Sequence, residues 1–246
     1  MLKTVAVRWA HAATAIAHHG TEERKGRIVM DRFVDRADAG NQLASALRDY
    51  AGRTDIVVLA LPRGGVPVAY PVARALHAPL DVLVVRKLGV PFDPELAMGA
   101  IASGGDLYLQ RSVIASMGVS DAQFNEVMAR ETDELRRREA LYRGAWPPEP
   151  VEGRTAIVVD DGIATGASMR VALQSLRERH TARIVVAAPI APADIRHTFD
   201  DLADAVVAVL RPQSFFGISQ FYVHFEQTSD EEVRFWLEAA RAGAQG

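Results

Sequence analysis

Residues 156–168 read AIVVDDGIATGAS. Apolar residues run into two adjacent acids, Asp160 and Asp161, and a loop of small residues leads directly into a helical pattern that starts near Met169. In open parallel α/β sheets, ligands bind in the crevice beyond the carboxyl ends of the strands. The segment therefore predicts an α/β fold with a binding site where this strand ends.

The chemistry of this segment suits a ligand with hydroxyl groups at one end and phosphate at the other. The carboxylates of Asp160 and Asp161 can accept hydrogen bonds from vicinal hydroxyls or reach a hydrated Mg²⁺, and the loop amides and helix dipole suit phosphate. Adjacent acids after a strand also commonly cap the next helix. The loop has neither the lysine of a P-loop nor the glycine spacing of a dinucleotide fingerprint.

Residues 156–168 resemble the signature of the type I phosphoribosyltransferases, which is an apolar strand, two acids and a loop ending in Thr-Gly-x-Ser/Thr. The resemblance covers about residues 30–240 and is closest to a bacterial group that carries PRGG and VRK strings, found here at 62–65 and 85–87. It implies a type I phosphoribosyltransferase-like parallel sheet flanked by helices, with a small hood and a helical insertion. It also implies Mg²⁺ as cofactor and a homodimer.

The remainder of the chain alternates between strand and helix patterns. This alternation predicts a parallel sheet covered on both faces. The expected strands are 56–61, 80–85, 155–159, 183–188 and 205–210, and the expected helices are 35–50, 66–76, 167–179 and 192–199.

We expect residues 1–28 to form an N-terminal extension and residues 29–246 to form the phosphoribosyltransferase-like domain. Within that domain, residues 111–150 predict a helical insertion, and residues 211–246 predict the hood and a last helix. Short strands near 100–101 and 107–109 predict a β-hairpin, and the two prolines and the charged clusters of residues 86–97 predict a long loop.

Two further strand ends carry residues suited to an anion. In Pro62-Arg63-Gly64-Gly65, glycines allow close approach of backbone amides, and Arg63 adds a bidentate donor. Arg86 and Lys87 place adjacent cations at the end of the strand expected at 80–85, which costs free energy unless an anion or acid compensates them. The resemblance implies that the first segment binds pyrophosphate and that the loop beginning at Lys87 closes over it.

The resemblance implies displacement at the anomeric carbon of phosphoribosyl pyrophosphate by a small base. Asp160 and Asp161 would hold the ribose hydroxyls, directly or through Mg²⁺, and Arg63 and Lys87 would stabilise the departing pyrophosphate. Gly64, Gly65 and Arg86 would add contacts to the substrate. The 5′-phosphate would lie against Gly162, Ile163, Ala164, Thr165, Gly166, Ala167 and Ser168.

The acceptor base is less well defined by the sequence. Members that use 6-oxopurines typically carry a third acid where this chain has Ala164, which argues against a hypoxanthine or guanine acceptor. Phe215 and Phe216 follow the last expected strand, and either could stack on a planar base. Adjacent aromatic residues are also typical of a core.

Composition narrows the classes of function. The net charge of −3 predicts no nucleic-acid partner, and no apolar run is long enough to predict a membrane span. The absence of cysteine excludes disulfides and thiolate catalysis and is compatible with a cytoplasmic protein. Two alternatives remain open, namely a regulator that binds phosphoribosyl pyrophosphate without turnover and a phosphatase-like Mg²⁺-dependent enzyme.

Overall fold

A computed structural model describes residues 32–243, and the compact unit begins at Phe33. The expected N-terminal extension, residues 1–28, lies outside the described residues. Five parallel strands form the central sheet in the order β2-β1-β6-β7-β8. Their bounds are Leu80–Val82 for β2, Ile56–Ala60 for β1, Thr155–Val159 for β6, Arg183–Ile190 for β7 and Ala205–Leu210 for β8. The predicted α/β class and parallel sheet are confirmed.

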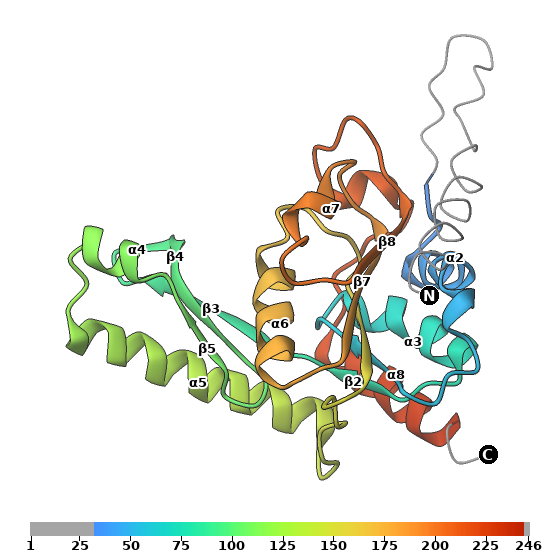
Figure 1. Cartoon of the computed structure of the whole chain (residues 1–246), viewed down its shortest axis with the longest axis horizontal. Coiled ribbons are helices and arrows are strands. Elements are labelled where there is room, and N and C mark those ends of the chain that lie inside the picture. Colours follow the sequence, from blue (N-terminus) through green and yellow to red (C-terminus); the bar gives the residue numbers. More distant parts are fainter. Residues whose placement is uncertain (1–31, 244–246) are drawn as a thin grey trace, which may run out of the picture. The chain divides into compact units, whose positions relative to one another are not determined.

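The central strands bury both faces, because successive side chains of a strand point to opposite sides. Helices α2, α3 and α8 cover one face, and helices α6 and α7 cover the other (Figure 1). The helix bounds are Arg36–Ala46, Gly65–Leu76 and Asp230–Gly243 on the first face, and Ala167–Glu178 and Ile195–Thr198 on the second. In β1, Val58 contributes to the first of these cores, and Val57 and Leu59 contribute to the second.

A second, antiparallel sheet joins β3 (Val85–Val90), β4 (Asp93–Ala102) and β5 (Leu107–Leu109). The predicted β4–β5 hairpin is confirmed, but the loop expected at residues 86–97 is wrong, because most of it pairs as β3 and β4. The register slips on both sides of Gly89, whose close packing against the Pro94 backbone leaves no room for a side chain. This irregularity accommodates a proline that normal pairing disfavours.

The predicted insertion consists of α4 (Arg111–Ser116) and the long helix α5 (Asp121–Arg143). Ser120 and Gln123 form the expected capping box at the start of α5. The helix runs alongside the β3–β5 sheet (Figure 1). We call β3, β4, β5, α4 and α5 together the arm.

The end of α5 is anchored to the central sheet. The buried Arg143 guanidinium donates to both carboxylate oxygens of Asp81 in β2, at 2.9 and 3.1 Å, and to the carbonyl of Val82 at 2.6 Å. A buried ion pair of this kind needs such additional hydrogen bonds to offset its desolvation. The arm is therefore fixed to the core at the base of α5.

The region expected to form the hood and last helix, residues 211–246, divides into two parts. A short 3₁₀ helix at Ile218–Phe221 lies beside the acid pair, whereas α8 packs against α3 and α5. The rings of Tyr70 in α3 and Trp236 in α8 lie 4.8 Å apart. Only the first part packs against the acid loop. No helix within residues 32–243 is long and apolar enough to cross a membrane.

Candidate functional site

The acid pair lies where β6 ends, at the junction between β1 and β6. The Asp161 amide donates to the Asp160 carboxylate at 2.9 Å. Gly166 begins helix α6 with a φ of +74°, and a Cβ there would lie 2.7 Å from the Phe199 ring, so both its conformation and its packing require glycine. The solvent-exposed residues are Ala164 and Thr165 in the loop and Ala167 and Ser168 at the start of α6. The loop thus presents polar groups and a helix start to solvent.

The loop after β1 packs directly onto the acid pair. A Cβ added to Gly64 would lie 2.0 Å from Asp161 Oδ2, and one added to Gly65 would lie 2.7 Å from the Val159 carbonyl and 3.1 Å from the Asp160 Cα. Neither position has room for a side chain. The glycines therefore bring together two loops that are about one hundred residues apart in the sequence.

Arg36 at the start of α2 is a site residue that the sequence did not indicate. Its Nε donates to Asp161 Oδ2 at 2.9 Å, a second guanidinium nitrogen lies 2.8 Å from the same oxygen, and the third donates to the Glu226 carbonyl at 2.7 Å. The guanidinium also lies 4.0 Å from the centre of the Phe225 ring. Tyr222 donates its hydroxyl to the Asp161 carbonyl at 2.7 Å. Asp161 is thus held on both its side chain and its backbone.

Burial sets the protonation behaviour of the two acids. Burial and the neighbouring Asp161 charge raise the pKa of the Asp160 carboxyl well above its usual value. Burial also raises the pKa of Asp161, while Arg36 opposes that shift. Within the described residues, no basic side chain forms an ion pair with Asp160. Of the two, Asp160 is the carboxylate that has no paired cation among residues 32–243.

Arg63 directly precedes Gly64 in the chain and is partly exposed. The peptide bond between Pro62 and Arg63 is cis. The Arg63 guanidinium is 3.9 Å from Asp230, the first residue of α8, and Asp230 accepts a hydrogen bond from the Tyr142 hydroxyl at 2.7 Å. At this distance the Arg63 interaction is a loose ion pair in a partly solvated place, and such pairs contribute little to stability. Arg63 therefore retains donors for a ligand.

The two cations of β3 are paired within the arm. The Arg86 guanidinium donates twice to Glu131 of α5, at 2.9 and 2.5 Å. The Lys87 ammonium lies 3.5 Å from the Glu95 carboxylate and 3.3 Å from its carbonyl. Glu131 is buried, but Glu95 is almost fully exposed, so the Lys87 pair is far easier to break. The expected compensation of these cations is supplied by acids of the arm.

The two candidate stacking residues of the hood behave differently. Phe215 is partly buried and stacks on Phe221 at 5.9 Å, whereas the Phe216 side chain is 91% exposed. A Cβ on Gly162 would lie 2.6 Å from Ile218, so the hood packs against the acid loop. Phe215 is a packing residue here, and Phe216 is the ring open to solvent.

The charged groups of the site are too few to hold a metal ion alone. The described residues contain no group of three or more acids and histidines close enough to bind one. Mg²⁺ usually keeps several waters and is bound by one or two carboxylates together with substrate phosphates. Asp160, as a carboxylate with no paired cation, fits that kind of shared site.

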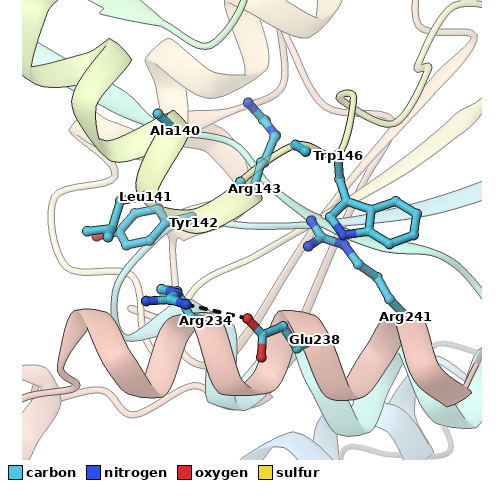
Figure 2. Close-up of a pocket in the computed structure, with 10 residues that line it drawn as sticks. Ala140, Leu141, Tyr142, Arg143, Trp146, Arg234, Glu238 and Arg241 are labelled. Atoms are coloured by element: carbon cyan, nitrogen blue, oxygen red, sulfur yellow. Dashed lines mark ion pairs between the residues drawn. The ribbon is translucent and has the colours of Figure 1, made fainter.

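A cavity of about 350 Å³ lies apart from these loops, between the end of α5 and α8 (Figure 2). Trp146 faces Arg241 there, and Arg234 pairs with Glu238 at 3.7 Å. No residue of the acid loop or of residues 62–65 lines it. The chemistry suggested by the sequence is thus not located in this cavity.

Comparison with known proteins agrees with this geometry. The family model for the phosphoribosyl transferase domain matches residues 31–225, which include both loops and the 3₁₀ helix at Ile218–Phe221. The chain belongs to this family. The resemblance noted from residues 156–168 is thereby confirmed.

Two curated relatives of this phosphoribosyl transferase domain protein come from strains of Mycobacterium tuberculosis, CDC 1551 and H37Rv, and each is named "Putative phosphoribosyl transferase". Each is 48% identical over 211 residues, which is 86% of this chain and 47% of the relative, so the chain spans about half the length of these relatives. The crystal structure of TT1426 from Thermus thermophilus is 42% identical, with a TM-score of 0.73, and the match covers 84% of this chain and 97% of that one. The fold described here therefore has a close experimental counterpart.

Proposed function

We propose that this chain transfers the 5-phosphoribosyl group from phosphoribosyl pyrophosphate to a nitrogenous base and releases pyrophosphate, with Mg²⁺ as cofactor. The observation that carries the proposal is the packing of Gly64 and Gly65 directly onto the acid pair. This packing would place carboxylates that can bind hydroxyl groups beside a glycine turn that can bind an anion, both at the carboxyl ends of β1 and β6. A substrate with ribose between a phosphate and a pyrophosphate matches this order of groups.

The 5′-phosphate would lie at the exposed start of α6, where Thr165, Ser168 and the amides of the first helical turn supply donors. The acid loop would accept hydrogen bonds from the ribose hydroxyls through a carboxylate of the acid pair. Arg63 would donate to the pyrophosphate from the adjacent turn. These contacts would hold the ribose still while the bond at its anomeric carbon is exchanged.

In the reaction, a nitrogen of the base forms a bond to the anomeric carbon as the bond from that carbon to the pyrophosphate oxygen breaks. Charge develops on the departing pyrophosphate, and donors placed there lower the barrier. Arg63 would serve this role, and Lys87 would join it after exchanging the exposed Glu95 for the ligand. When bound, Mg²⁺ would neutralise negative charge on substrate oxygens, and Asp160 would help to hold it. No covalent nucleophile from the protein is needed.

The acceptor would enter beside the hood, where Phe216 offers an exposed ring for stacking. The exposed methyl side chain of Ala164 supplies no acid at the place where a 6-oxopurine would exchange a proton. An acceptor that needs no proton transfer from the loop therefore fits better than hypoxanthine or guanine.

A second candidate is a regulator that binds phosphoribosyl pyrophosphate without turnover. The ion pairs of Arg86 and Lys87 favour it, because both cations of the arm already have acidic partners. The two functions share the ligand and differ in whether the anomeric bond is broken.

The deciding experiment measures pyrophosphate release from phosphoribosyl pyrophosphate and Mg²⁺ across a panel of purine and pyrimidine bases. Calorimetry in the same buffer records ligand binding, and the Asp160→Asn variant provides the blank. Release with one base identifies the enzyme and its acceptor class. Binding without release from any base favours the regulator, and absence of binding refutes both.

A further inference from the structure

The two neighbouring acids have different surroundings. Oδ2 of Asp161 receives two guanidinium nitrogens of Arg36 and lies in the space that a Gly64 side chain would need. Only 12% of the Arg36 side chain and 13% of the Asp161 side chain are exposed. The Asp160 carboxylate accepts one hydrogen bond, from the Asp161 amide. Oδ2 of Asp161, with two close donors, is poorly placed to bind a third group.

Arg36 also links parts of the chain that are distant in sequence. Its three guanidinium nitrogens reach the acid loop and the Glu226 carbonyl, and its plane lies over the Phe225 ring. A planar guanidinium with several donors is suited to holding such a junction. Tyr222, in the same C-terminal stretch, holds the Asp161 carbonyl. The contacts tie the start of α2, the acid loop and residues 222–226 together.

We propose that Asp161 and Arg36 are positioning residues and that Asp160 alone is the ligand-facing carboxylate of the pair. Arg36 holds Asp161 turned away from the ligand, and Asp161 in turn fixes the acid loop against Gly64. The ribose hydroxyls and any shared Mg²⁺ are then left to Asp160. This division rests on the proposed function and assigns separate roles to two residues that the sequence presents as equivalent.

The proposal predicts opposite effects on stability for the two acids. Asp161→Asn leaves a buried arginine without its anion, so the melting temperature should fall by about 5 °C. Asp160→Asn removes a charge that has no cationic partner, so the melting temperature should stay unchanged or rise. Both variants keep the shape of the side chain, which makes each the control for the other.

The test combines melting temperatures with calorimetry of phosphoribosyl pyrophosphate binding to the full chain, with and without Mg²⁺. Asp160→Asn should lose the strengthening that Mg²⁺ brings, and Asp161→Asn should keep most of it. Arg36→Gln should behave like Asp161→Asn, and Arg36→Lys should recover part of the stability and binding. The double variant Arg36→Gln/Asp161→Asn should melt no lower than Arg36→Gln alone, because the pair is already broken.

Two results would overturn the proposal: loss of the Mg²⁺ effect in Asp161→Asn as complete as in Asp160→Asn, or additive melting-temperature losses in the double variant. If the native chain binds no phosphoribosyl pyrophosphate, the proposed function fails and the assignment of Asp160 fails with it. The positioning role of Arg36 and Asp161 is still decided in that case by the melting temperatures, which need no ligand.

Discussion

The loops of the central sheet and the arm both carry charged residues, but they compensate the charges differently. In the arm, Arg86 has the buried Glu131 as partner, and Lys87 has the exposed Glu95. At the central sheet, Arg36 compensates Asp161, while Asp160 has no paired cation among the described residues. A charged residue beside a site is thus available to a ligand only to the extent that its own protein partner is weak or absent.

The largest expected effect that separates the two β3 cations is at Lys87. Its partner is exposed, so Lys87→Ala should lower kcat/KM for phosphoribosyl pyrophosphate about 100-fold through lost stabilisation of the leaving group. Arg86→Lys should alter kcat/KM much less and mainly reduce thermal stability, because a single ammonium cannot replace the paired donors to Glu131.

Steady-state kinetics and thermal melts of both variants test this contrast. Arg137→Ala is the matched control, since it removes a solvent-exposed arm cation whose ion pair within residues 32–243 is with Glu134 of its own helix. Equal losses of kcat/KM in the Lys87 and Arg86 variants would contradict the idea that only the weakly paired cation is available to the ligand.

The next effect concerns the junction of the two central loops. Gly64→Ala places a methyl group on the Asp161 carboxylate, so we expect a loss of about 2 kcal/mol of unfolding free energy and weaker ligand binding. Gly217→Ala is the control, because a Cβ there meets nothing within 4 Å and the backbone is extended. Urea unfolding measures both variants, and equal stability would show that the loops do not depend on this close contact.

The smallest expected effect lies where the arm meets the core. Tyr142→Phe removes the hydrogen bond to Asp230 and should cost about 1 kcal/mol of unfolding free energy at pH 7. Burial raises the pKa of the Tyr142 hydroxyl to about 12, from about 10 in the unfolded chain. The folded state therefore holds a proton that the unfolded state releases between these values.

The native protein should accordingly lose stability as the pH rises from about 10 to 12, and the Tyr142→Phe variant should lack that part of the loss. Denaturant titrations of both proteins across this range measure it. If the unfolding free energies of the two proteins fell equally over this range, the raised pKa of the Tyr142 hydroxyl would not be the cause of the loss.

Much of the fold was predictable from local pattern. The apolar runs at 56–61 and 155–159 and the helical periods that follow them are confirmed as β1, α3, β6 and α6. These elements are predictable because strand and helix leave different periods in the sequence. The prediction of a loop at 86–97 was wrong. Its prolines and charges are typical of a loop, but hydrogen bonding to neighbouring strands makes most of the segment β-strand, and this pairing cannot be read from the local sequence.

For the site, the sequence determined which strand ends carry acids and glycines, since these positions follow from local order along the chain. The expected position of Arg86 and Lys87 at the end of a strand over 80–85 was wrong, because β2 ends at Val82 and both cations lie within β3. The sequence could not show that Arg36 contacts Asp161, 125 residues away in the sequence, nor that Arg86 is paired with Glu131. Pairing of charges depends on distances between elements, and those arise only when the helices pack on the sheets. Tertiary packing therefore decided which of the charges remain for a ligand.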